Sequence, residues 1–206
     1  MGDLTTTSYA LLGLLALRPW STYELAKQME RSLGWIWPRA ESRLYEEPKK
    51  LVAAGLARSS REHRGRRPRT VYAITAKGRR ELAAWLETPG AGALLEFEAL
   101  LKVSFGDQGS KQGVLANLDA IIADTQARAA TGARLAEEYT RGVGPFPERL
   151  HVSSLMWRFL WEHNATIERW ALWARAEVQT WPEVTSQAEG LRRFRHTVAA
   201  ATASPR

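Results

Sequence analysis

Arginine side chains are the groups in this sequence with the clearest potential for chemistry. Six of them lie between Arg58 and Arg69, and Glu62 is the one acidic residue among them. A guanidinium group is planar and always charged, and it can pair bidentately with a phosphate group. Charge runs of this kind also occur in ordinary solvated loops. Taken alone, the run is compatible with a phosphate-bearing partner and with a simple surface loop.

The excess of positive charge is confined to the first part of the chain. Residues 1–88 contain 16 Lys and Arg against 9 Asp and Glu, whereas residues 89–206 contain 13 of each. The formal net charge of +7 therefore arises in the first 88 residues. Such asymmetry indicates a module for a nucleic acid or another anionic surface, joined to an electrically neutral module.

The segment 37–75 contains the elements that must position these arginines. We expect a helix in part of 39–54, ended by Gly55, and then a hairpin with strands 56–61 and 70–74. The arginine-rich tip would be 62–69. A helix followed by a basic hairpin is typical of a winged helix-turn-helix, in which the helix enters the DNA major groove and the hairpin reaches the backbone.

One residue conflicts with a regular helix in this segment. Pro48 lacks a backbone N–H, and in a helix interior it would clash with the carbonyl of Leu44, a defect of about 3 kcal/mol. We therefore expect a kink at Pro48.

The candidate DNA contacts come from this helix and from the hairpin tip. They are Arg39, Ser42, Arg43, Tyr45, Lys49, Lys50, Arg64, Arg66, Arg67 and Arg69. The first three lie near the start of the helix and are candidate base readers, whereas Lys49 and Lys50 suit phosphates. The helix residues could equally be ordinary solvent-facing side chains. Tyr45 is compatible with a place in the core or with a phosphate contact.

Two helices are expected before this segment. The apolar run 8–17 predicts a buried first helix, too short to span a bilayer. Ser21 and Glu24 have the spacing of a capping box, and apolar residues at helical spacing then predict an amphipathic helix over 21–33. Gly34 is the expected C-cap of that helix.

The remainder of the chain predicts a boundary and then helices alone. A fourth helix should begin at 75–78, and the glycine-containing strip 88–93 predicts a domain boundary. Beyond it, helical segments are expected over 94–105, 110–141, 150–181 and 184–197, with a frayed tail over 199–206. The predicted fold is mainly α with a small β-hairpin: a winged helix-turn-helix domain, 1–88, plus a C-terminal helical dimerisation or effector domain, 94–198.

The predicted helix 150–181 is apolar on two sides. Leu155, Phe159 and Trp170 belong to one face, while Trp157 and Trp161 project from another. A helix that is apolar on two sides should be buried on two sides, which favours a partner chain and a homodimer. Packing inside a monomer core is an alternative. A third is an effector site whose walls are Trp157 and Trp161, because indole rings stack on flat compounds.

Several function classes are disfavoured. Cysteine is absent, which excludes thiolate metal sites and a cysteine nucleophile. The four histidines lie at no metal-ligand spacing, and no catalytic motif is present, so we expect no enzyme, no metal and no cofactor. The chain starts with polar residues rather than a secretory signal, and no segment is long and apolar enough for a membrane span. The expected location is cytoplasmic.

Several short segments resemble the PadR family of bacterial transcriptional regulators. They are 8–15 (SYALLGLL), 21–26 (STYELA), 44–45 (LY), 50–51 (KL), 55–56 (GL) and 72–78 (YAITAKG). The resemblance covers residues 4–88 densely, whereas the later helices are similar to that family only in layout. Pro48 stands where family members commonly carry an apolar helix residue.

The resemblance implies a homodimeric repressor that binds double-stranded DNA. It also implies dimerisation through the C-terminal helices, and small aromatic or amphiphilic compounds as effectors. Together with the residues above, it predicts a sequence-specific repressor that a small molecule releases. The alternative is a protein-interaction adaptor or sensor whose winged domain binds a protein partner.

Overall fold

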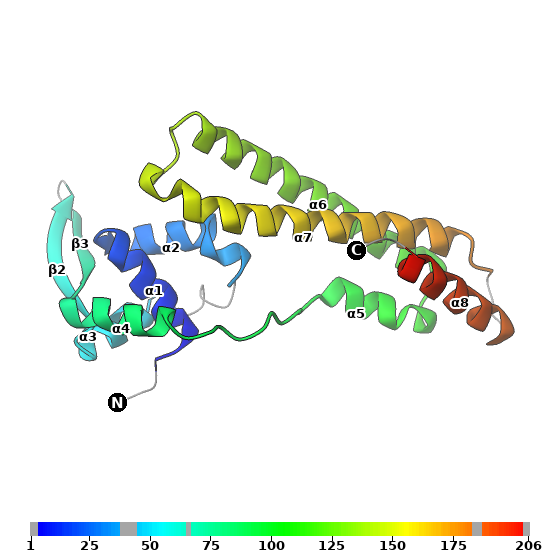
Figure 1. The fold of residues 1–206 in the computed structure, drawn as a ribbon, viewed down its shortest axis with the longest axis horizontal. Helices are drawn as coiled ribbons and strands as arrows, with labels where there is room; N and C mark the ends of the chain where they lie inside the picture. The colour runs from blue at the N-terminus through cyan, green and yellow to red at the C-terminus, as the bar shows by residue number, and fades with distance from the viewer. Residues whose placement is uncertain (1–3, 38–44, 65–66, 183–186, 204–206) are drawn as a thin grey trace. The chain divides into compact units, whose positions relative to one another are not determined.

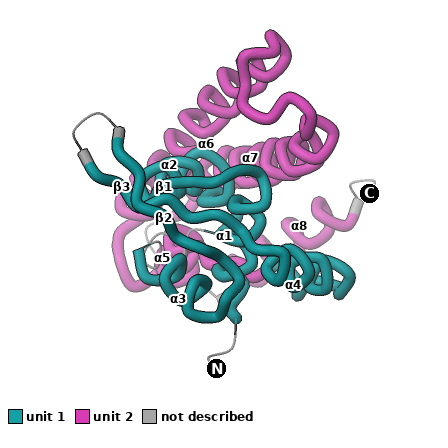
Figure 2. Tube along the Cα trace, turned by 90° about the vertical axis from the view of Figure 1, so that its left-hand side faces the viewer, with its two compact units in different colours: residues 1–93 teal, residues 94–206 magenta. Residues whose placement is uncertain are grey.

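The computed structural model of the chain describes residues 4–37, 45–64, 67–182 and 187–203. It divides into two compact units, residues 1–93 and 94–206, which Figure 2 shows in different colours. Residues 89–97, where the two units join, have no regular secondary structure. Helices predominate and a small antiparallel sheet accompanies them, which confirms the predicted fold class.

The first unit contains four α-helices and a three-stranded sheet in its described residues (Figure 1). In chain order they are α1 (Thr6–Leu17), β1 (Trp20–Ser21), α2 (Thr22–Arg31), the 3-10 turn η1 (Leu33–Trp35), α3 (Glu47–Ala53), β2 (Ala57–Arg64), β3 (Arg67–Ile74) and α4 (Ala76–Leu86). The strand order is β1-β3-β2, and both pairings are antiparallel.

Side-chain caps set the starts of α1, α2 and α4. The predicted capping box is confirmed: the Ser21 hydroxyl accepts from the backbone N–H of Glu24, whose carboxylate accepts from the N–H of Ser21. Thr5 and Thr75 cap the other two helices. The prediction for the other end of α2 is wrong, because its C-cap is Ser32 and Gly34 lies in η1. The Ser32 hydroxyl donates to the carbonyl of Gln28 and closes the helix two residues earlier.

The predicted buried first helix is confirmed and supplies the centre of the core of this unit. Three of its leucines are fully or almost fully buried, together with apolar residues of α2, α3, the sheet and the turn before β2: Leu11, Leu12, Leu15, Trp20, Leu25, Met29, Leu51, Leu56 and Val71. A buried Leu side chain contributes about 1.5–3 kcal/mol relative to an exposed one. The helices and the sheet of this unit are therefore held to one another by a shared apolar interior.

The kink predicted at Pro48 is absent from the described residues. Helix α3 begins at Glu47, so Pro48 lies in the first turn. Backbone N–H groups in the first turn have no hydrogen-bond partner within the helix, so the N–H that proline lacks is not needed there. Gly55, with a φ of 71°, ends this helix as predicted. Residues 39–44 of the expected recognition segment lie outside the described residues.

The hairpin strands are longer than predicted. β2 and β3 pair from Ala57↔Ile74 to Arg64↔Arg67, so most of the expected loop 62–69 is strand. A favourable cross-strand pair contributes to the longer ladder, because Glu62 lies directly opposite Arg69 and accepts from its guanidinium at 3.1 Å.

The YAITAKG motif joins α4 to the end of α3. The Thr75 hydroxyl donates to the carbonyls of Gly55 and Leu56, and the Lys77 ammonium donates to the carbonyl of Ala54. Gly78 is buried at the same contact, where an added Cβ would lie 2.1 Å from the Leu56 carbonyl oxygen. The motif thus requires glycine for close approach of two backbones.

We expect Gly78→Ala to destabilise the protein even though alanine is the better helix former. The backbone must shift to relieve the clash, which should lower the free energy of unfolding by about 1–3 kcal/mol. A lower midpoint of urea unfolding measures this loss. Gly13→Ala in α1 is the matched control, because its added Cβ would meet no atom within 4 Å beyond its chain neighbours and the nearby backbone of its own helix. The control should gain about 0.5–1 kcal/mol. Equal stability of the two variants would contradict the role assigned to Gly78.

The second unit is helical throughout its regular structure. Its elements are α5 (Glu98–Ser104), η3 (Gly106–Gln108), α6 (Lys111–Thr140), η4 (Pro147–Arg149), α7 (Leu150–Gln179) and α8 (Gln187–Ala203). The helix predicted over 94–105 is shorter than expected, since residues 94–97 precede α5. The tail predicted to fray from Ala199 is helical as far as Ala203.

Helices α6 and α7 form an antiparallel pair (Figure 1). Val114, Leu118 and Ile121 of α6 pack in one buried cluster with small and branched residues of α7. The Asn164 side chain donates to the carbonyl of Thr125 at 2.9 Å, and the Lys111 ammonium donates to carbonyls at the end of α7. In the described part of the chain, no helix is long and apolar enough to cross a membrane.

Candidate nucleic-acid interface

The structure describes some of the candidate DNA contacts and not others. Arg39, Ser42, Arg43 and Arg66 lie outside the described residues. The backbones of Arg64 and Arg67 face each other at the ends of β2 and β3, where the hairpin turns. Tyr45, Lys49, Lys50 and Arg69 have described side chains.

Three candidates lie in or just before α3. Tyr45 precedes the helix and its side chain is 66% exposed, so its place in the core is ruled out and its hydroxyl is accessible. The Lys49 ammonium donates to Glu46 at 2.9 Å, and this hydrogen bond is the main cause that raises the pKa of Lys49. Both partners are exposed, so Lys49 can exchange this carboxylate for a phosphate at small cost in free energy.

Lys50 has a different kind of partner. Its ammonium lies 3.3 Å from the Glu47 carboxylate, which is almost fully buried. Glu47 also accepts a hydrogen bond from the Ser8 hydroxyl of α1. This buried acid fixes the start of α3 to α1, a role that we did not predict. Its one local signal was an acidic residue in the first turn of a helix, where the helix dipole favours negative charge.

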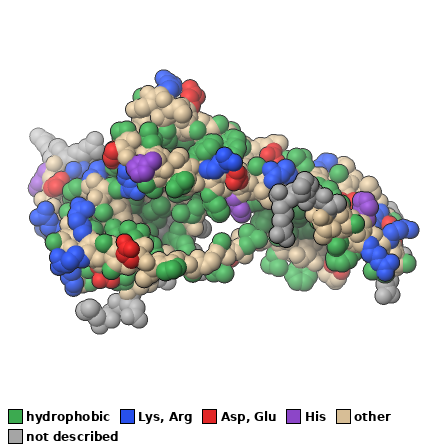
Figure 3. Space-filling view, viewed as in Figure 1, with side chains coloured by type: hydrophobic (Ala, Val, Ile, Leu, Met, Phe, Trp, Pro, Cys, Tyr) green, Lys and Arg blue, Asp and Glu red, His purple; other side chains and the backbone are tan. Residues whose placement is uncertain are grey.

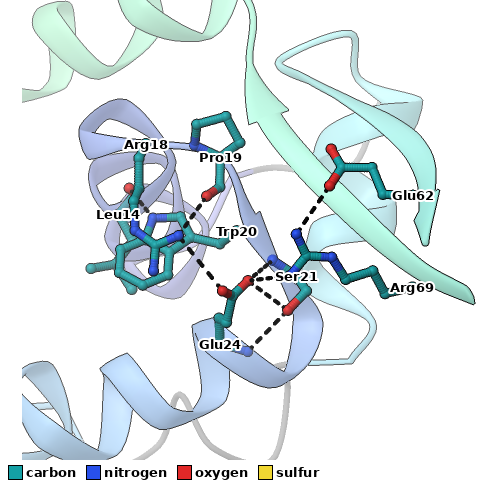
Figure 4. A network of polar contacts seen from close by, with 8 residues as sticks. All are labelled: Leu14, Arg18, Pro19, Trp20, Ser21, Glu24, Glu62 and Arg69. Atoms are coloured by element: carbon teal, nitrogen blue, oxygen red, sulfur yellow. Dashed lines mark hydrogen bonds and ion pairs between the residues drawn. The ribbon is translucent and has the colours of Figure 1, made fainter. Parts of the chain in front are cut away.

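Arg69 points back into the first unit (Figure 4). Its guanidinium lies 3.1 Å from Glu62 and 3.7 Å from Glu24, and its Nε atom is buried. Arg18 also pairs with Glu24, at 3.7 Å. Glu24 and Arg18 were absent from the predicted contacts, because Glu24 was already explained by the capping box.

Basic side chains gather over the hairpin on the face shown in Figure 3. The described side chains of Arg58 and Arg61 on β2 are exposed. Residues 58–69 contain six arginines and one glutamate, so this hairpin carries a concentrated positive charge. Such a surface favours association with a polyanion and makes that association sensitive to salt.

The two candidate effector residues lie in contact in the second unit. The rings of Trp157 and Trp161 stack with their centroids 5.1 Å apart and an interplanar angle of 19°. The indole N–H of Trp157 donates to the carbonyl of Gly132 in α6, and the Trp161 ring lies against the same glycine. The two indoles therefore face each other, and Trp161 remains partly exposed to solvent.

The described side chains include no group of three or more His, Cys, Asp or Glu residues that could hold a metal ion.

Comparison with protein families gives a match to the Transcriptional regulator PadR-like family over residues 11–84. Two relatives are similar in sequence. One is the probable transcriptional regulator Rv1176c of Mycobacterium tuberculosis, 30% identical over 118 residues, or 53% of this chain and 62% of the relative. The other is the negative transcriptional regulator PadR of Bacillus subtilis, 33% identical over 79 residues, or 38% and 43% of the two chains. The chain thus spans less than two thirds of the length of either relative.

Solved structures share the fold across both units. The PadR-like transcriptional regulator BC1756 from Bacillus cereus has a TM-score of 0.72 and 19% identity, with 85% of this chain and 97% of that chain covered. Bacillus subtilis PadR in complex with operator DNA has a TM-score of 0.69 and 22% identity, with 84% and 99% covered. The same protein in complex with p-coumaric acid has a TM-score of 0.64 and 21% identity, with 87% and 100% covered.

The motifs, the helices and hairpin of the first unit, and these similarities agree. Residues 11–84 therefore carry the pattern of the PadR-like family of transcriptional regulators.

Proposed function

We propose that this protein is a sequence-specific DNA-binding regulator, and more narrowly a dimeric repressor that a small molecule releases from DNA. The observation that carries the proposal is a winged helix-turn-helix unit that holds the whole positive charge excess of the chain. The complex of Bacillus subtilis PadR with operator DNA, which shares this fold, supports it. The proposal is regulation rather than catalysis, because the matched family consists of transcriptional regulators.

The proposed DNA contacts divide into two groups. Around α3, the segment 39–45 would read base edges and Lys49 and Lys50 would bind phosphates. On the wing, which is the β2–β3 hairpin, Arg64, Arg66 and Arg67 would contact the DNA backbone or a narrow minor groove. The exposed hydroxyl of Tyr45 suits a phosphate oxygen.

A second copy of the chain is the proposed partner of α7. Leu155 is 74% exposed and Phe159 is 57% exposed, and they lie one turn apart on one face of this helix with Val152 beside them. An exposed apolar row of this kind favours a self-complementary interface. Two winged units held in this way would address half-sites about 34 Å apart.

The repressor and effector parts of the proposal draw on one relative. That protein is named a negative regulator, and it is the protein solved with p-coumaric acid. An effector would act by binding more tightly to the form of the dimer that cannot engage DNA. We place the site at Trp157 and Trp161, where a flat compound would stack on the accessible indole. Planar phenolic compounds that changed neither operator binding nor tryptophan fluorescence would count against this part.

The first experiment is binding to promoter DNA beside the protein's own gene, compared with random DNA of equal length across a salt series. We expect the promoter to bind at least about 1,000-fold more tightly, with an affinity that falls steeply as salt rises. Equal affinity for both DNAs would exclude sequence-specific regulation. Equal affinity for both, together with insensitivity to salt, would favour the protein-interaction adaptor.

A further inference from the structure

Arg69 belongs to the arginine run of the wing, yet its surroundings differ from those of a surface cation. Its side chain is 34% exposed, and its guanidinium lies between two carboxylates that come from different elements (Figure 4). Glu62 reaches it from the neighbouring strand β2 at 3.1 Å, and Glu24 reaches it from α2 at 3.7 Å. Arg69 therefore connects the wing to the helical part of the unit.

Glu24 is a rigid partner for this contact. Its Oε2 atom accepts from the Ser21 backbone N–H at 2.8 Å and from the Ser21 hydroxyl at 2.7 Å. Arg18 lies 3.7 Å away on its other side, with its own guanidinium 3.5 Å above the Trp20 ring. The same carboxylate thus caps α2 and receives two arginines.

These neighbours stabilise the negatively charged form of the Glu24 carboxylate. The hydrogen bond from the Ser21 backbone is the main cause that lowers the pKa of Glu24, and the adjacent Arg18 and Arg69 lower it further. A group whose pKa is lowered on folding contributes stability above its ordinary pKa and loses it as pH falls through the lowered value. The contact with Arg69 is therefore intact throughout the neutral range.

The position of Arg69 along the hairpin indicates that its contact with Glu24 and Glu62 would limit the movement of the wing. Strand β1 supports β3 at Tyr72 and Val71 only. From Thr70 to the tip the hairpin is a two-stranded ribbon, and such a ribbon is marginally stable by itself. Arg69 and Glu62 form one of the first cross-strand pairs of this two-stranded part, so a tether there limits how the rest of the wing moves.

We propose that Arg69 is a positioning residue that holds the wing in its DNA-binding orientation through Glu24 and Glu62, and that it does not contact DNA. The inference rests on the proposed DNA-binding function. To bind a phosphate, Arg69 would have to leave both carboxylates. The phosphate would then replace anions that Arg69 already contacts, so little free energy of binding would be gained. The arginines nearer the tip lie beyond this tether and remain the proposed phosphate contacts.

The test is the double variant Glu24→Gln with Glu62→Gln. Glutamine is accepted at the third position of a capping box, so the start of α2 is preserved while both negative charges are lost. The positioning role predicts about tenfold weaker binding to operator DNA, because a loosened wing must be ordered on binding. A purely electrostatic effect has the opposite sign, since the variant is more positive and would bind more tightly.

The matched control is Glu30→Gln with Glu87→Gln, which removes two exposed carboxylates from the same unit. It should bind as tightly as the unaltered protein or more tightly. Arg69→Gln should weaken DNA binding as much as the Glu24/Glu62 variant does. A variant with all three substitutions should bind DNA no more weakly than either of these, because every one of them breaks the same contact.

Two further readouts separate the explanations. A positioning role leaves the slope of log affinity against log salt unchanged in Arg69→Gln, whereas loss of a phosphate contact lowers it by about 0.9. Without DNA, hydrogen exchange of the amides of β2 and β3 should be faster in the Glu24/Glu62 variant than in its control. Tighter DNA binding by the Glu24/Glu62 variant, a lower salt slope in Arg69→Gln or unchanged exchange would overturn the inference. Failure of the unaltered protein to prefer its operator would instead overturn the proposed function, and the exchange experiment would still test the tether.

Discussion

Replacement of Arg66 and Arg67 together by glutamate is expected to weaken binding to operator DNA by about 100-fold or more. Each guanidinium lost from a phosphate removes a charge-assisted hydrogen bond of about 1.5–3 kcal/mol, and the new carboxylates repel the DNA backbone. The loss should apply to operator and random DNA alike, because phosphate contacts carry no sequence information. Fluorescence anisotropy across a salt series measures both the affinity and a decrease of about 2 in the salt slope.

The control for this variant is Arg134→Glu in α6 with Arg141→Glu at the C-cap of the same helix. These arginines are exposed and pair with glutamates in the second unit, so the control changes net charge equally at a different place. We expect it to reduce DNA affinity much less. If Arg66 and Arg67 could be reversed with no change in DNA affinity, the adaptor would become the better explanation of the winged unit.

Leu155→Glu combined with Phe159→Glu is expected to convert a dimer to a monomer at micromolar concentration. Both side chains are exposed in the single chain, so new carboxylates are tolerated there but would meet their own copies across a symmetric interface. Loss of the second wing removes the avidity of two linked sites, which amounts to about 100- to 10,000-fold in operator affinity. Analytical ultracentrifugation and operator titration measure the two effects.

Leu172→Glu serves as the control, because Leu172 is also exposed on α7 but lies on a different face from Leu155 and Phe159. It should remain dimeric and bind DNA normally. The assignment of the interface fails if the Leu155/Phe159 variant stays dimeric, or if the unaltered protein is a monomer under the same conditions.

Local patterns were sufficient for much of the fold. The Ser21–Glu24 capping box, the buried first helix and the long helices of the second unit were all predictable, because each depends on neighbours within a few residues. The errors at Gly34 and Pro48 have the same origin. A glycine or a proline marks the approximate end or start of a helix, whereas the actual residue depends on which side chains satisfy the free backbone groups.

For the candidate site too, some features follow from local sequence patterns and others depend on the tertiary structure. The sequence by itself determined that the first 88 residues hold the positive charge excess, and that a helix and a hairpin carry it, because charge and periodicity are properties of the chain. Only the tertiary structure decided which partners individual charges contact within the chain. Arg69 lies between Glu24 and Glu62, and Lys50 lies beside the buried Glu47, although neither contact was predicted. Strand register and helix packing select such partners, and since they bring together residues far apart in the chain, no local pattern records them.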